Sequence, residues 1–198
     1  MSSEVSICNL TLSNIGVHTI DSISGLDLPP EAAACKLHYY PARDAVLRDF
    51  NWSFAKRIGT LAATTEEVLG WAYAYQYPTD CLKARGIYNP SSKLAADAIP
   101  FDTSANAALN NQLVLTDHAE AVLIYTARVT DTNLFDSLFL EAFTLKLGSA
   151  LAMPLKGDLA LKQGLLQEYL KFIESAKTGS ANESFVKPTT DNSFLRSR

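Results

Sequence analysis

The sequence predicts an α+β protein: a four-helix-type bundle of two N-terminal and two C-terminal helices, with an inserted antiparallel β domain and an extended C-terminal tail. Apolar residues recur at helical steps of three and four near both ends of the chain, and they alternate every two residues in its middle. The last residues are rich in Ser, Thr and Asn, a composition that cannot fold alone. We therefore assign residues 1–56 and 130–177 to a discontinuous helical domain, 57–129 to the β domain and 178–198 to the tail.

The first helix is expected over residues 3–15, because Cys8, Leu12 and Ile15 recur on one face and Gly16 follows where helices commonly stop. A second helical pattern runs over residues 31–50. It contains a proline inside the run, at position 41, which removes one backbone hydrogen bond and crowds the preceding turn. We expect a kink or a restart of the helix at that proline.

Large aromatic residues lie where the second helix ends and the strands begin. Trp52 and Phe54 are separated by one residue, and Lys56 and Arg57 follow them. Burial of two large rings between the helices and the sheet can stabilise the fold by roughly several kcal/mol. We therefore predict that Trp52 and Phe54 form a structural seam, with the two basic residues facing solvent or a neighbour.

Strand-like patterns fill the middle of the chain. Residues 71–77 alternate four aromatic residues with smaller ones, which would place all four on one face of a sheet. Residues 81–88, 111–116 and 121–129 are also strand-like and are separated by Asn and Pro punctuation. Short, evenly spaced strands of this kind indicate an antiparallel sandwich or barrel.

Helical spacing returns at residue 133 and ends near Met153-Pro154, and Gly157-Asp158 offers the N-cap of a last helix. The tail beyond residue 177 carries apolar side chains in only two pairs. Such a segment can dock on a partner or stay without a role, and the two pairs favour docking.

The composition excludes several classes of protein. At 198 residues, 47% hydrophobic and 19% charged, the chain is globular, and a net charge of −4 lacks the basic footprint of a nucleic-acid-binding protein. The N-terminus has no signal-peptide pattern, and no stretch approaches about 18 apolar residues, so we expect no membrane span. Cys8, Cys35 and Cys81 are far apart and predict reduced thiols.

No catalytic or cofactor motif is present in the sequence. The scattered glycines form no phosphate-binding loop. Asp117-His118 near Glu120 could supply metal ligands, but a solvated turn explains them better, and Cys81 beside Asp80 lacks an identifiable base. Paired carboxylates for glycoside hydrolysis are available without a pattern that selects any pair; the candidates are Glu66, Asp80, Asp102, Asp117, Asp131 and Glu141.

Three stretches of the chain resemble the tail tubular protein A family of short-tailed bacteriophages, whose members are head-to-tail connectors, also described as gatekeepers or adaptors. They are ACKLHYYPARDAVLRDFNWSFAKR at 34–57, YAYQYPTDCLKA at 73–84 and LIYTARVTDTNLFDSLFLEAFTLKLGSALAMPLKGD at 123–158. The order and spacing of the boxes carry the resemblance, which covers most of the chain from about residue 5 to 178. The matching positions are Tyr40, Pro41, Arg43, Asp44, Trp52, Phe54, Ala55, Tyr73, Tyr75, Pro78, Asp80, Cys81, Leu82, Tyr125, Val129 and Asp131.

The resemblance implies a non-enzymatic subunit of the virion tail, assembled in the host cytoplasm, that uses no cofactor, metal or membrane. Copies of the chain, twelve by analogy, would form a ring between the portal protein and a tail nozzle protein like tail tubular protein B. Duplex DNA would pass through the lumen during ejection without specific binding, helped by the acidic balance of the chain. The tail would clasp the portal through Phe185, Val186, Phe194, Leu195, Arg196 and Arg198.

Two alternatives remain at this point. The first is a carbohydrate-degrading hydrolase associated with the phage tail, which would need an acid and a base that no residue pair identifies. The second is a soluble monomeric binding module, against which only the resemblance argues.

Overall fold

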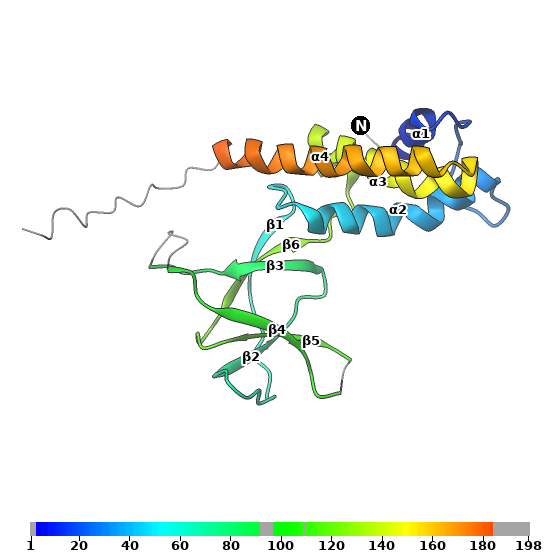
Figure 1. Ribbon diagram of the computed structural model, residues 1–198. Helices are drawn as coiled ribbons and strands as arrows, with labels where there is room; N and C mark the ends of the chain where they lie inside the picture. Colours follow the sequence, from blue (N-terminus) through cyan, green and yellow to red (C-terminus); the bar gives the residue numbers. More distant parts are fainter. Residues whose placement is uncertain (1–2, 92–96, 109, 184–198) are drawn as a thin grey trace, which may run out of the picture.

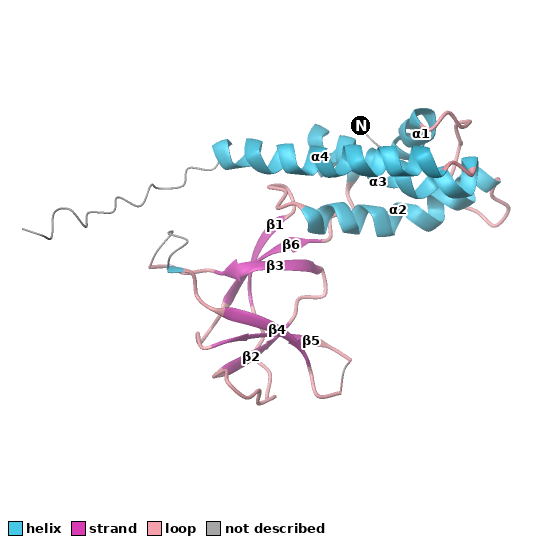
Figure 2. Ribbon diagram, in the orientation of Figure 1, coloured by secondary structure: helices cyan, strands magenta, loops and turns pink. Residues whose placement is uncertain are grey.

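The computed structural model describes residues 3–91, 97–108 and 110–183, and it places helices in one layer and strands in another (Figures 1 and 2). Within these residues the fold is α+β, as predicted, with four α-helices and two small antiparallel sheets. The elements in chain order are α1 (Glu4–Asn14), α2 (Pro30–Asp49), β1 (Lys56–Thr60), β2 (Tyr73–Gln76), β3 (Cys81–Ile87), β4 (Phe101–Ala105), β5 (Gln112–Thr116), β6 (Val122–Ala127), α3 (Ser137–Lys156) and α4 (Leu159–Glu183).

Helix α1 begins with a reciprocal cap. The Ser3 hydroxyl accepts a hydrogen bond from the Ser6 backbone N–H, and the Ser6 hydroxyl accepts one from the Ser3 N–H. Further along the helix, the Asn9 side chain bonds both the N–H and the carbonyl of Ile20, at 2.8 and 2.9 Å. The predicted first helix is confirmed, and Asn9 fixes the irregular link that follows it.

Helix α2 runs without a break through Pro41. Of the kink or restart that we expected there, the restart does not occur. An interior proline costs about 3 kcal/mol or more in an isolated helix. Here the residues on both sides of it, Tyr39, Ala42 and Val46, are buried in the helical core. Their burial holds the turn in helical geometry and offsets the cost of the proline.

Helix α3 is the central helix, since it packs against α1, α2 and α4. We expected it to end near Met153-Pro154, but it continues to Lys156 and ends at Gly157, which has φ 64°. Pro154 lies in the last turn, where it removes a single bond, whereas a left-handed glycine supplies a complete helix stop. The position of the glycine therefore decides where α3 ends.

By length and composition, α3 is the one helix within the described residues that could cross a membrane, although the sequence led us to expect none. Half of its most apolar window is buried against the rest of the chain. A core helix contacted by three neighbours has the same composition as a membrane span, so this finding follows from the position of α3 in the fold.

Asp158 precedes helix α4 as its N-cap, and its carboxylate accepts a hydrogen bond from the Leu161 N–H at 2.9 Å. The helix extends to Glu183, into the segment that we assigned to the tail. Each residue added to an existing helix gains one backbone bond for the two dihedrals it fixes, so a polar sequence can continue a helix that it could not start. The rest of the tail lies outside the described residues.

The two sheets have the strand orders β1-β6-β3 and β2-β5-β4. Strands β2, β3, β5 and β6 confirm the predicted strand segments, whereas β1 and β4 were not predicted. Both missed strands are edge strands with mostly exposed side chains, KRIGT and FDTSA, so neither shows the apolar alternation that marks a strand in the sequence.

The aromatic stripe of residues 71–77 does not lie on one face. Tyr73 and Tyr75 share a face, with ring centroids 6.3 Å apart, and Tyr75 is buried between the sheets. Trp71 precedes β2 and packs in a separate cluster with Ala74 and Leu115. The prediction of four aromatics on one face was wrong, because the strand begins only at Tyr73 and period-two alternation holds only within a strand.

Candidate functional site

Trp52 and Phe54 lie in the segment that joins the end of α2 to β1, which we call the seam. Trp52 is 2% exposed, and its indole N–H donates to the Val46 carbonyl at 2.9 Å. Its ring makes edge contacts with Phe50 and Phe139, and Phe54 also contacts Phe139. Trp52 and Phe54 therefore belong to the helical core and close its end toward the sheets.

A basic clip, formed by Arg48, Lys83 and Arg85, crosses the seam. Arg48 of α2 donates to the Leu82 carbonyl of β3 at 2.6 Å, and Lys83 of β3 donates back to the Arg48 carbonyl at 3.3 Å. The last carbonyls of a helix lack intrahelical partners and carry the negative end of its dipole. Lys83 therefore gives the free carbonyl at the C-terminal end of α2 a hydrogen-bond donor, and its positive charge offsets the negative end of the helix dipole.

Arg85 is the centre of the clip. Its guanidinium donates to the Trp52 carbonyl and the Thr126 hydroxyl, both at 2.8 Å, and to the Asn51 carbonyl at 3.4 Å. Burial lowers the pKa of Arg85, but an arginine stays protonated at any physiological pH. One side chain thus ties β3 and β6 to the segment that leaves α2.

A second link joins α2 to the end of β6. The Asp44 carboxylate accepts hydrogen bonds from Arg43 at 2.8 Å and from Arg128 at 2.9 Å. The Arg43 side chain is 5% exposed, so its charge requires this carboxylate. Asp44 therefore neutralises a buried arginine and holds the exit of the last strand.

Asp80 makes the third link, within the β region. Its carboxylate accepts from the Arg57 guanidinium at 2.9 Å and from the Tyr125 hydroxyl at 3.1 Å. Burial, and then the bond to Asp80, raise the pKa of Tyr125, so this hydroxyl stays protonated and continues to donate. The turn before β3 is therefore fixed to β1 and β6.

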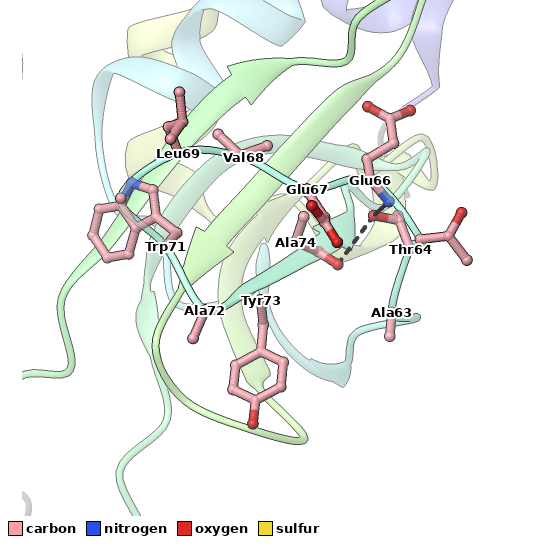
Figure 3. A pocket seen from close by; sticks show the side chains of 12 residues that line it. Ala63, Thr64, Glu66, Glu67, Val68, Leu69, Trp71, Ala72, Tyr73 and Ala74 are labelled. Carbon is pink, nitrogen blue, oxygen red and sulfur yellow. Dashed lines mark hydrogen bonds between the residues drawn. The ribbon is translucent and has the colours of Figure 1, made fainter.

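A loop at the far end of the β region encloses a hollow in the surface. This distal loop, residues 63–74, surrounds about 700 Å³ with its own side chains (Figure 3). Its ends are held together because the Thr64 N–H donates to the Ala74 carbonyl at 2.9 Å. Asp117 accepts from the Ala72 N–H, and Glu66 accepts from the Ala107 N–H. The loop is therefore tied to its surroundings at several points.

Five of the six carboxylates considered for hydrolysis have structural partners, and the sixth, Glu141, is exposed on α3. Asp80, Asp102, Asp117, Asp131 and Glu66 each accept a hydrogen bond from the backbone or from a structural side chain. Over residues 3–91, 97–108 and 110–183, no three His, Cys, Asp or Glu side chains are grouped to hold a metal ion. The geometry selects no acid and base pair from this set.

The thiols form no reactive site. The pKa of Cys35 is lowered by its hydrogen bond with Cys8, but the Cys35 side chain is fully buried and out of reach of a substrate. Burial raises the pKa of Cys81, which opposes the thiolate form that a nucleophile needs. Cys8 and Cys35 are fully buried in the helical core, and the bond of the Cys8 thiol to Cys35, together with burial, raises the pKa of Cys8. The three cysteines are free in the structure, as predicted, and act as small core residues.

The residues predicted to bind the portal cannot be placed, because they lie outside the described residues. They are Phe185, Val186, Phe194, Leu195, Arg196 and Arg198. Comparison of the chain with models of known protein families and with curated proteins gives no match.

Sequence reasoning missed the basic clip and the distal loop. Lys83 and Arg85 alternate along β3, which was a signal that both could face the helices. The segment Val68-Leu69-Gly70-Trp71 was a signal for a turn at the tip of the distal loop.

Proposed function

We propose that this chain is a structural head-to-tail adaptor, a subunit of a homo-oligomeric ring between the portal and the tail nozzle of a short-tailed phage, with a channel for DNA. In this proposal the four helices act as one bundle built from residues 1–56 and 130–177. Residues 57–129 form an inserted β domain, and the tail binds the portal. The protein has no catalytic role.

One observation carries the proposal. Positions that match the family pattern lie in three separate boxes, and two of them, Asp80 and Asp44, bond residues of other boxes. Asp80 of the second box bonds Arg57 at the end of the first and Tyr125 of the third, while Asp44 of the first bonds Arg128 of the third. A pattern whose members hold two parts of a chain together is expected of a subunit that transmits mechanical load.

The direction of α4 gives further support. Figure 1 shows α4 running along the helical layer, with its C-terminal end beyond the rest of that layer. The polar segment with its two apolar pairs continues from that end. In the proposal, the segment that follows Glu183 begins at this end of α4, where a neighbouring protein has access to it.

Native mass spectrometry tests the proposal, using the full chain alone and mixed with the portal ring of the same virion. We expect a large complex with a fixed number of copies per portal. A chain ending at Glu183 keeps α4 and should lose portal binding, as should a variant with Ser at both apolar pairs. A matched control replaces Thr189 and Thr190 with Ala and should bind normally.

A monomeric chain that ignores the portal would refute the adaptor proposal. Unchanged portal binding by the shortened chain would refute the role of the tail and leave the ring to be explained by other surfaces.

A further inference from the structure

The distal loop exposes apolar side chains that no other part of the described chain covers. Leu69 at its tip is 101% exposed, and Tyr73 at its end is 42% exposed. Burying one leucine side chain is favourable by about 1.5–3 kcal/mol. A partner that covered Leu69 would gain this free energy, because the loop holds the side chain in water.

The loop is held in its present shape. Trp71 N–H donates to the Val68 carbonyl at 3.2 Å, and Gly70 between them has φ 91°. These are the features of a type II turn with Leu69 at its first corner. Together with the bonds at the base of the loop, the turn presents Leu69 without a large ordering cost on binding.

The part of the β region away from the seam is acidic in composition. Residues 58–79 and 86–127 contain a single basic residue, Lys93, against six acidic residues. The acidic residues are Glu66, Glu67, Asp97, Asp102, Asp117 and Glu120. Figure 3 shows Glu67 and Trp71 on two sides of the hollow. The loop itself therefore carries two acidic side chains, Glu66 and Glu67, and Asp117 adjoins it through the Ala72 N–H.

We propose that the distal loop is the docking site for a protein segment that places a large apolar side chain next to lysine or arginine. Leu69 and Trp71 would contact the apolar side chain, and Glu67 would face the basic one. Charge complementarity selects the partner and speeds its encounter, while the apolar contact supplies most of the affinity. The inference rests on the proposed function in one respect: in the adaptor, this partner is the tail nozzle protein.

The fluorescence of Trp71 reports the test, because Trp52 is buried and gives a constant background. The probe is the peptide Gly-Lys-Phe-Lys-Leu-Lys-Gly, and its counterpart carries Glu at each Lys. We expect the full chain to bind the basic peptide and not the acidic one. Binding should weaken as salt is raised toward about 1 M, where the Debye length is about 3 Å.

Leu69→Ser should weaken binding about tenfold, and Glu67→Gln should weaken it about threefold and reduce its dependence on salt. The matched control is Leu26→Ser, since Leu26 is 103% exposed on the link between α1 and α2. That variant should bind like the parent.

Equal binding of both peptides, or unchanged binding by Leu69→Ser, would overturn the inference. A second arm repeats the measurement with the purified nozzle protein of the same virion. If the basic peptide binds at Leu69 and the nozzle protein does not, the docking chemistry stands, and the nozzle contact of the proposed function fails.

Discussion

Replacing Arg85 with Met removes the charged donor at the centre of the basic clip and keeps most of the apolar stem of the side chain. Two acceptors at 2.8 Å, the Trp52 carbonyl and the Thr126 hydroxyl, lose their donor, and a third at 3.4 Å loses a weak one. A hydrogen bond to a charged group contributes about 1.5–3 kcal/mol. Arg85 is half-buried, and water can reach some of the vacated acceptors, so we take the low end for the two short bonds. The expected loss is about 3 kcal/mol of unfolding free energy.

Urea unfolding followed by two signals measures this effect. Far-UV circular dichroism reports mainly the helices, and Trp71 fluorescence, measured with Trp52→Phe in every chain compared, reports the far end of the β region. The two transitions should coincide in the parent chain and separate in Arg85→Met, because the clip couples the two parts. The matched control is Arg57→Met, which breaks an ion pair whose arginine side chain is 67% exposed and should cost less than about 1 kcal/mol. An Arg85→Met variant within about 0.5 kcal/mol of the parent, with coincident transitions, would refute the coupling role of the clip.

Four other changes test the packing. Trp52→Ala should cost about 3–5 kcal/mol in urea unfolding, since the ring is 2% exposed and contacts three other aromatic rings. Tyr39→Phe should leave stability unchanged or raise it by about 1 kcal/mol in a thermal melt, because the buried Tyr39 hydroxyl has no hydrogen-bond partner within the described structure. Gly70→Ala should cost about 1–2 kcal/mol, since φ 91° strains any residue with a Cβ although no atom lies within 4 Å to obstruct one. Burial, and then the hydrogen bond to the Asp49 carboxylate, raise the pKa of Tyr169. The stability that the Tyr169 hydroxyl contributes is therefore complete below about pH 10 and is lost as the pH rises further. Tyr169→Phe should reduce this loss of stability at alkaline pH, as measured in thermal melts over a range of pH.

The sequence predicted the elements that bury a regular apolar pattern. The helices around Tyr39 and Phe143 were found because one face of each is apolar at steps of three and four, and burial of that face is what stabilises them. Strand β5 was found because Leu113, Val114 and Leu115 form a short buried run. In these cases the local pattern and the tertiary environment favour the same structure.

The sequence could not predict features that depend on distant partners. The function of Arg85 depends on carbonyls that are 33 and 34 positions away, and a carbonyl acceptor carries no sequence signal. Strand β1 forms because β6 offers it a register from Lys56 opposite Thr126 to Thr60 opposite Val122. Its own side chains show too little alternation to predict this pairing.

The net charge of the chain hides an uneven distribution of basic and acidic residues between the seam and the far end of the β region. Five of the 17 basic residues lie at the seam and take part in the links between the two parts; they are Arg43, Arg48, Lys83, Arg85 and Arg128. A net charge of −4 therefore averages a basic seam with a far end that carries six acids and one base. Phosphate repulsion falls off within a Debye length of about 8 Å, so it acts locally rather than through the net charge. In the proposed ring, the far end of the β region would repel passing DNA, whereas the seam is suited to holding the subunit together.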